Sequence, residues 1–168
     1  MDITIESATK VDLESLNTHL PTNIPHFHGD RIADHEFGNS DWLIAHKDGF
    51  PVGHFLLRWD GSHNQAVQKF ISNCPHLESG GVKEEFRKQG IATQLITTAE
   101  DMVRKRGFKQ IGMAVGATDN PQSRHLYEKL GYKEWSHGTF VESWRVIDQD
   151  GKEITEREIC TYLIKILS

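Results

Sequence analysis

Apolar side chains recur along the chain with the two periods that are typical of strands and helices. Residues 3–5 alternate apolar and polar side chains as a short strand does, whereas residues 11–20 carry apolar side chains at helical spacing. The clearest helix is predicted over residues 91–106, because its apolar side chains recur every three or four positions and Gly107 follows as a C-terminal cap.

Strands and turns are predicted through the middle of the chain. The pattern indicates a hairpin at residues 42–59, with its turn at residues 47–49. A strand at residues 76–82 ends in two glycines, where a bulge could form. Residues 21–41 contain two prolines and two glycines, so we predict a loop there with one short helix at residues 31–37.

The last third of the chain continues this mixture of strands and helices. A strand at residues 111–115 precedes a helix with Asn120 as its N-cap and Pro121 in its first turn, and the helix ends at Gly131. Strands follow, the last of them apolar at residues 160–167. This order of elements favours an α/β or α+β fold in which helices flank a mixed central sheet.

Composition and charge narrow the classes of protein. Of the 168 residues, 37% are hydrophobic and 26% charged, as in an ordinary soluble globular protein, and the length suits one domain over residues 1–168. The net charge of −5 gives no field that attracts nucleic acid. Neither a secretory signal pattern nor an apolar run of membrane-spanning length is found, so we expect a cytoplasmic protein with no membrane partner.

Cysteines and histidines do not form a predicted metal site. Cys74 and Cys160 lie far apart and form no CxxC pair, which argues against a zinc site or a disulfide framework. The ten histidines include His26 and His28, with His35 nearby, but this segment has no predictable rigid geometry. Histidines that line a cleft or lie on the surface fit better, and we expect no metal.

The turn before the long helix suits an anion. A helix start leaves backbone N–H groups unpaired, and the helix dipole adds positive potential there. Gly90 and Ala92 allow a ligand to approach the backbone, and Arg87 and Lys88 add positive charge, so a phosphate or pyrophosphate fits best. The glycine motifs of nucleotide hydrolysis and of hydride transfer are both missing. Because basic residues before a helix are also common on solvated surfaces, the turn alone leaves both interpretations open.

Two motifs resemble those of the GNAT superfamily of N-acetyltransferases. Residues 82–92, VKEEFRKQGIA, are similar to its acetyl-CoA signature, Gln/Arg-x-x-Gly-x-Gly/Ala at a helix start. Residues 120–132, NPQSRHLYEKLGY, resemble its segment Asn-x-x-Ala/Ser-x-x-x-Tyr-x-x-x-Gly-Phe/Tyr. The two motifs stand in the right order, with one helix and one strand between them, and the resemblance covers residues 76–135. Glu84 and Ala92 replace the Pro and Gly of many members, which does not threaten the assignment.

The resemblance implies how acetyl-CoA, the expected cosubstrate, would bind. In this family two adjacent parallel strands splay apart and the pantetheine arm inserts between them; here these are residues 76–82 and 109–115. The backbone of Val82 would pair with the pantetheine amides, Asn120 would reach the same arm, and the turn amides would hold the pyrophosphate. The implied contacts are Val82, Arg87, Lys88, Gln89, Gly90, Ile91, Ala92 and Asn120.

The resemblance also implies an enzyme, an acetyl-CoA-dependent N-acetyltransferase in which a primary amine attacks the thioester directly. Tyr127 stands where the family places a tyrosine that protonates the departing thiolate, although it could simply anchor its helix. His76 and Glu78 share one face of their strand and are candidates for accepting the amine proton, Glu78 being preferred; either could equally be a solvated edge residue. A backbone N–H near Val82 is the expected donor to the oxyanion.

The acceptor, a small-molecule amine or a peptide amine, is expected between residues 17–40 and 136–155. Acidic and aromatic side chains there would suit a cationic amine, or they could serve solubility alone. The alternative function is a non-catalytic acyl-CoA sensor or interaction module on the same fold. The strand at residues 160–167 could form a homodimer or lie within the sheet. The side chains expected around the acceptor are Asp30, Asp34, Glu36, Glu142, Trp144, Asp148 and Asp150.

Overall fold

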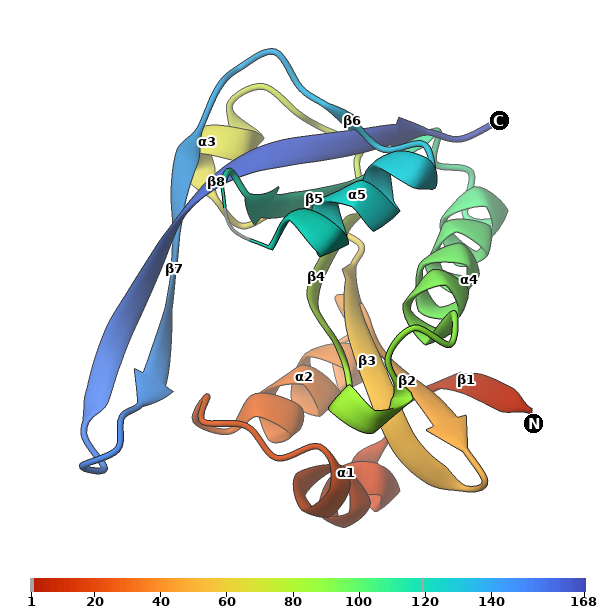
Figure 1. The fold of residues 1–168 in the computed structure, drawn as a ribbon. Coiled ribbons are helices and arrows are strands. Elements are labelled where there is room, and N and C mark those ends of the chain that lie inside the picture. Colours follow the sequence, from red (N-terminus) through yellow and green to blue (C-terminus); the bar gives the residue numbers. More distant parts are fainter. Residues whose placement is uncertain (1, 119) are drawn as a thin grey trace.

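The structure is built on one mixed sheet. A computed structural model describes residues 2–118 and 120–168, and in this part of the chain eight strands form a single sheet (Figure 1). Its order is β1-β2-β3-β4-β5-β8-β6, and β7 pairs with β8 beside this path. The strands are β1 (Ile3–Ser7), β2 (Ser40–Lys47), β3 (Phe50–Arg58), β4 (His76–Val82), β5 (Gln110–Gly116), β6 (Lys133–Glu134), β7 (Phe140–Ile147) and β8 (Glu153–Ile166). The helices are α1 (Leu13–His19), α2 (Phe27–Glu36), α3 (Gln65–Gln68), α4 (Ile91–Lys105) and α5 (Pro121–Lys129), with 3-10 turns η1 (Lys10–Asp12) and η2 (Glu84–Phe86).

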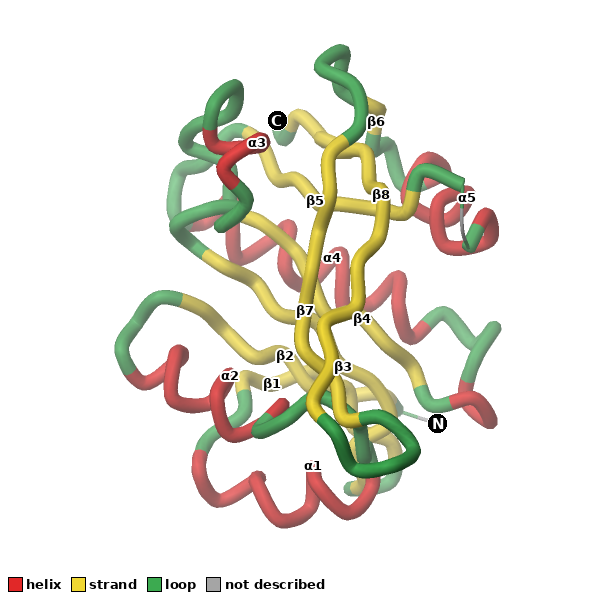
Figure 2. Tube along the Cα trace, turned by 90° about the vertical axis from the view of Figure 1, so that its left-hand side faces the viewer, coloured by secondary structure: helices red, strands yellow, loops and turns green. Residues whose placement is uncertain are grey.

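Helices cover both faces of the sheet, and the alternation of side chains along β2 shows how. Trp42 and Ile44 are buried with residues of α1 and α2, whereas Leu43 and Ala45 belong to the core that includes α4. Figure 2 shows α4 crossing behind the strands. The prediction of a mixed central sheet flanked by helices is therefore confirmed.

Helix α4 has the ends and the buried face that its sequence predicts. Gly90 precedes it with φ 81° and Gly107 follows it with φ 86°, a conformation that glycine adopts without strain. Glu100 lies on the buried face too, where it accepts hydrogen bonds from the Tyr132 hydroxyl at 2.8 Å and from Lys165 Nζ at 2.9 Å. A carboxylate can be buried here because both of its oxygens are paired. The apolar buried residues of the helix are Ile91, Leu95, Ile96, Ala99 and Val103.

Strands β4 and β5 run parallel and then separate. His76 pairs with Gly112 and Leu77 pairs with Met113, and in the described residues no further pair joins the two strands. From Glu78 onwards β4 diverges from β5 and stays paired with β3 alone. The splayed pair of parallel strands expected from the resemblance is confirmed.

A bulge in β4 follows the point of separation. Ser79 and Gly80 together lie opposite the single residue Phe55 of β3, and Ser79 has φ 56°. A Cβ on Gly80 would overlap the Phe55 ring, so any other residue there requires the ring or the strand to move. The sequence predicted a bulge at the two glycines, and the structure places it one residue earlier.

Helix α2 is longer than the sequence predicts, because it begins at Phe27 rather than at residue 31. His26 precedes it in a left-handed conformation, and Gly29 lowers its helix propensity. Packing stabilises the helix instead, since Phe27 and Ile32 are buried against β2 and α1. The longer helix places Phe27 and Arg31 one turn apart on the same face.

The C-terminal strands form a long two-stranded ribbon. Strand β7 pairs with the first half of β8, from Ile147 opposite Glu153 to Phe140 opposite Cys160. The second half of β8 lies between β5 and β6, so the last strand is internal to the sheet at this end. The free end of the ribbon projects away from the sheet, on the side away from α4 (Figure 1).

Candidate active site

Two adjoining cavities lie where β4 and β5 separate. The larger, of about 920 Å³, is bounded by β4, the segment that joins α1 to α2, and the β7–β8 ribbon. The smaller, of about 440 Å³, lies along the turn before α4 and along α5. The two cavities are continuous with each other, and Gly80, Gly81, Val82 and Tyr127 line both. The other residues that line both are Phe55, Arg87, Asn120 and Ser123.

The smaller cavity brings together residues that the sequence predicted to hold acetyl-CoA. Gln89 is the exception, because its side chain accepts a hydrogen bond from Lys47 Nζ at 2.9 Å and does not line either cavity. The predicted residues that do line the smaller cavity are Val82, Arg87, Lys88, Gly90, Ile91, Ala92 and Asn120.

The first turn of α4 faces open space. A Cβ on Gly90 would meet nothing within 4 Å, so glycine is required there for its positive φ and not for room. Arg87 Nε donates to the Val82 carbonyl at 3.0 Å and ties the turn to the end of β4. An anion at this end would meet unpaired backbone N–H groups and the charges of Arg87 and Lys88. The residues present therefore fit the phosphates of a coenzyme A molecule.

Helix α5 places Tyr127 at the junction of the two cavities. Asn120 caps the helix, and its side chain accepts a hydrogen bond from the Ser123 N–H at 3.4 Å, as predicted. Tyr127 is half-buried against the main core, and burial raises the pKa of its hydroxyl. The phenol is therefore protonated at neutral pH and can donate a proton.

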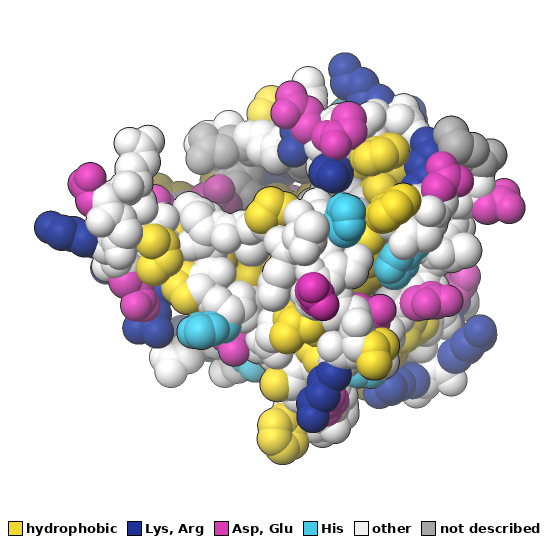
Figure 3. Space-filling view, turned by 90° about the horizontal axis from the view of Figure 1, so that it is seen from below, with side chains coloured by type: hydrophobic (Ala, Val, Ile, Leu, Met, Phe, Trp, Pro, Cys, Tyr) yellow, Lys and Arg dark blue, Asp and Glu magenta, His cyan; other side chains and the backbone are white. Residues whose placement is uncertain are grey.

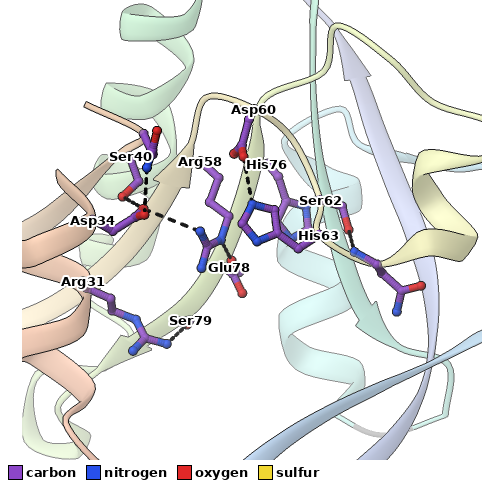
Figure 4. A network of polar contacts seen from close by, with 12 residues as sticks. Arg31, Asp34, Ser40, Arg58, Asp60, Ser62, His63, His76, Glu78 and Ser79 are labelled. Carbon is purple, nitrogen blue, oxygen red and sulfur yellow. Dashed lines mark hydrogen bonds and ion pairs between the residues drawn. The ribbon is translucent and has the colours of Figure 1, made fainter. Parts of the chain in front are cut away.

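Glu78 of β4 is held in an ion pair with Arg58 of β3. Arg58 Nε donates to the Glu78 carboxylate, and Arg58 Nη1 lies 3.5 Å from Asp34 Oδ2 on α2 (Figure 4). Burial alone would raise the pKa of Glu78, but the opposing influence of His76 and Arg58 is larger, and the pKa is lowered. Glu78 is therefore ionised at neutral pH, in a position that α2 helps to fix.

His76 lies at the start of β4 and lines the same cavity as Glu78, as their spacing predicts. Its ring is buried and stacks on Tyr162 with 6° between the planes, and its Nδ1 is hydrogen-bonded to the Tyr162 hydroxyl at 2.9 Å. Burial lowers the pKa of His76 to about 4, so the imidazole is neutral at pH 7. At that pH Arg58 is therefore the main partner of the Glu78 charge.

Three residues that the sequence did not single out, Phe27, Arg31 and His54, also line the larger cavity. His54 Nδ1 donates to the Ser79 carbonyl at 2.6 Å, and burial lowers the pKa of His54 to about 4. Arg31 Nη2 donates to Ser79 Oγ at 2.7 Å. The spacing of Phe27 and Arg31 would have placed them on one helix face, had the start of α2 been predicted correctly.

Most of the acidic residues expected around the acceptor do not line the larger cavity, so the prediction is wrong for them. Glu142 and Trp144 line the larger cavity, and burial raises the pKa of Glu142. Asp34 instead pairs with Arg58 and accepts from Ser40, because α2 turns it toward β3. The other acidic residues expected there lie outside this cavity; they are Asp30, Glu36, Asp148 and Asp150.

The histidines near α2 do not converge on one point. His28 Nε2 donates to the Leu20 carbonyl at 2.8 Å while its Nδ1 accepts from Trp42 Nε1 at 3.2 Å, and His35 Nδ1 bonds to the Ser40 carbonyl at 2.8 Å. Within residues 2–118 and 120–168, no group of three His, Cys, Asp or Glu side chains is placed to hold a metal ion.

The surface shows no sorting of charge on the face seen from below, where basic and acidic side chains are interspersed (Figure 3). In the described part of the chain, no helix combines the length and the apolar character needed to cross a membrane.

Comparison with known proteins identifies the family. The family model described as the acetyltransferase (GNAT) family matches residues 11–132. An N-alpha-acetyltransferase of Saccharolobus solfataricus is 28% identical over 142 residues, which are 79% of this chain and 81% of that protein.

Solved structures share the fold over nearly the whole chain. The ribosomal-protein-S18-alanine N-acetyltransferase from Escherichia coli has a TM-score of 0.67 at 17% identity, covering 99% of this chain and 95% of that one. The PaiA N-acetyltransferase from Thermoplasma acidophilum, in complex with coenzyme A, has a TM-score of 0.66 at 16% identity, covering 99% of each chain.

The chain belongs to the acetyltransferase (GNAT) family. It is an acetyl-CoA-dependent N-acetyltransferase, and acetyl-CoA is its cosubstrate.

Proposed function

We propose that this enzyme acetylates a primary amine of a small molecule, which binds in the larger cavity, by direct attack of the amine on the acetyl group. One observation carries the proposal: the two cavities meet at Gly80, Gly81, Val82 and Tyr127, where β4 and β5 separate. A donor in the smaller cavity and an acceptor in the larger one would approach each other there.

We assign the donor to the smaller cavity. Acetyl-CoA supplies an activated acetyl thioester when bound. The turn amides with Arg87 and Lys88 would hold its phosphates, and the backbone of Val82 and the side chain of Asn120 would hold its pantetheine arm. The remaining proposed contacts are Gly90, Ile91 and Ala92, and of Gln89 only the backbone N–H, because its side chain is bonded to Lys47.

We assign two proton transfers to side chains at the junction. The protonated hydroxyl of Tyr127 donates to the coenzyme thiolate as it departs. Glu78, which is ionised at neutral pH, accepts a proton from the ammonium group of the acceptor, either directly or through a water molecule, and the neutral amine then attacks the acetyl carbonyl. His76 is the second candidate for this role and a poorer acceptor, because it is buried and hydrogen-bonded to Tyr162.

The size of the larger cavity favours a small acceptor. A volume of about 920 Å³ lies within the range of sites that enclose small molecules, and the β7–β8 ribbon bounds it on one side. A peptide amine is the second candidate, since the relative from Escherichia coli is named for acetylating a ribosomal protein. The cytoplasmic location, the single domain and a homodimer stay predictions.

A non-catalytic acyl-CoA sensor is the alternative function. The ion pair of Glu78 with Arg58 favours it, because pairing with a cation weakens a carboxylate as a base.

Calorimetric titration with acetyl-CoA, followed by a thiol-release assay over a panel of amines, tests the proposal. Coenzyme binding with turnover of one class of small amines is expected. Tight binding without turnover of any amine would favour the sensor, and turnover of peptides alone would reassign the acceptor.

A further inference from the structure

Arg31 brings a positive charge to the wall of the larger cavity without a carboxylate partner. From α2 it donates through Nη1 to the Phe27 carbonyl at 2.9 Å. Its Nη2 donates to Ser79 Oγ at 2.7 Å (Figure 4). Among the described residues, no Asp or Glu oxygen lies within 4.0 Å of its guanidinium. The nearby carboxylates of Asp34 and Glu78 pair with Arg58 instead.

The positive charge of Arg31 is partly removed from water and has no paired negative charge. Burial lowers the pKa of Arg31 to about 10, partly offset by Glu78, so the guanidinium remains charged at neutral pH. Its Nε is buried and has no hydrogen-bond partner in the described structure. Removing a charged group from water without a paired counter-charge is costly, so an anion bound next to Arg31 would stabilise it.

The guanidinium is held rigidly, with its hydrogen-bonding edge still partly free. Its central carbon lies 3.8 Å from the centroid of the Phe27 ring and 5.3 Å from that of Trp42. Stacking of this kind uses the flat face of the group and leaves the N–H donors at its edge. An arginine has five such donors, and only two are used by Phe27 and Ser79.

The β4 bulge completes this position. Ser79 sits at the bulge with φ 56°, and its hydroxyl accepts from Arg31 on the same cavity wall. Because that hydroxyl accepts the arginine N–H, its own hydrogen remains available to a ligand oxygen. Arg31 and Ser79 thus offer donors to one anionic group, although they lie 48 positions apart in the chain.

We propose that Arg31, with Ser79, binds a carboxylate carried by the acceptor, so that the molecule acetylated at its amine is an amino acid or a similar amino-carboxylate. This inference rests on the proposed function. A carboxylate carries one negative charge and two coplanar oxygens, which match a single guanidinium edge. Glu78, Glu142 and Glu158 line other parts of the same cavity and favour the ammonium end of such a molecule.

An amino-carboxylate acceptor would distinguish this enzyme from an enzyme that acetylates polyamines. A polyamine has no group for Arg31 and would place a second cation near it. A peptide N-terminus carries its terminal carboxylate several residues away, too far to share one cavity with the amine. The acceptor should therefore lose activity when its carboxylate is replaced by a neutral carboxamide.

The experiment compares amino acids with their own carboxamides in the thiol-release assay. The panel holds α-amino acids, amino acids with wider spacing between amine and carboxylate, the carboxamide of each, polyamines and short peptides. Wild type is compared with Arg31→Gln, with Arg31→Lys, and with Arg145→Gln, which removes an exposed arginine of β7 that does not line the cavity. Melting temperature and acetyl-CoA binding show which variants are folded.

The expected result is a ratio of kcat/KM, acid over carboxamide, of at least about tenfold for one acceptor in wild type. The ratio should fall to about one in Arg31→Gln, persist in part in Arg31→Lys and be unchanged in Arg145→Gln. Intrinsic reactivity opposes this preference, because an α-amine beside a neutral carbonyl has a pKa of about 7.7–8.0 and is more often unprotonated.

Equal rates on acid and carboxamide in wild type would overturn the inference, and so would a ratio that Arg31→Gln leaves unchanged. Turnover confined to polyamines or peptides would also overturn it while leaving an N-acetyltransferase in place. Absence of turnover on every amine would instead contradict the proposed function on which the inference rests. The wild-type ratio alone decides the matter if Arg31→Gln does not fold.

Discussion

Arg58 and Glu78 form an ion pair in the wall of the larger cavity, and Asp34 approaches Arg58 from α2 at 3.5 Å. The two residues come from adjacent antiparallel strands, where Leu56 lies directly opposite Glu78, so Arg58 reaches the carboxylate diagonally. The protein thus fixes a charged carboxylate beside the junction of the two cavities before any acceptor binds.

Replacing Arg58 by glutamine is expected to lower the free energy of unfolding at pH 7 by about 1–3 kcal/mol, because it leaves Glu78 partly buried without its partner. The loss should lie near the lower end of this range, since the Glu78 side chain is 35% exposed and solvent screens its charge. Urea unfolding measures this. Arg145→Gln, which breaks the exposed pair of Arg145 with Glu153, is the matched control and should change stability by less than about 0.5 kcal/mol.

The stabilisation by Arg58 should depend on pH with a defined sign. The pKa of Glu78 is lowered in the folded protein, so the pair contributes its full stability above the ordinary carboxyl pKa of about 4.3. That contribution is lost as the pH falls through the lower pKa of the folded state. The stability difference between wild type and Arg58→Gln should therefore be full at neutral pH and shrink below about pH 4. A difference that grows in acid would show that Glu78 is not the partner that matters.

Gly80→Ala should disturb the bulge in β4, because the new methyl group would lie 2.4 Å from the Phe55 ring. We expect a loss of about 1–3 kcal/mol in stability, together with weaker acetyl-CoA binding. Phe55→Leu in the same chain removes the ring and should restore part of the binding, although it costs some packing of its own. A Gly80→Ala protein with wild-type stability and affinity would mean that the close contact with Phe55 is easily relieved.

Lys88→Gln should weaken acetyl-CoA binding by about two- to fivefold at low salt, since it removes one positive charge beside the first turn of α4. Lys105→Gln removes the same charge from the last turn of the same helix and should have no such effect. Titration calorimetry at low and high ionic strength provides the test, and the difference between the two variants should narrow as salt rises. If Lys88→Gln and Lys105→Gln bound acetyl-CoA with equal affinity at low salt, the phosphates would not lie beside Lys88.

Much of the fold follows from local patterns in the sequence. Helix α4 could be predicted because Ile91, Leu95, Ala99 and Val103 recur at helical spacing, and β4 because its residues lie between recognisable turns. The coenzyme-binding turn could be predicted because the residues that form it are consecutive in the sequence.

The acceptor cavity could not be predicted in the same way, because its contacts join distant segments. Arg31 meets Ser79 across 48 positions, and Arg58 meets Glu78 across 20. The start of α2 depends on burial of Phe27 and not on helix propensity, so Arg31 had no visible role in the sequence. Where tertiary packing sets the position of a side chain, local pattern carries little information about it.

The proposed mechanism depends most on Tyr127, so the decisive experiment measures turnover and acetyl-CoA affinity together in Tyr127→Phe. Tyr127 lies at the junction of the two cavities, so kcat should fall by about a hundredfold or more while acetyl-CoA affinity stays unchanged. Tyr132→Phe is the control: it removes a hydroxyl bound to Glu100 at 2.8 Å in the core and should lower stability while sparing kcat. Equal kcat for Tyr127→Phe and wild type would contradict the assignment of Tyr127 as the proton donor.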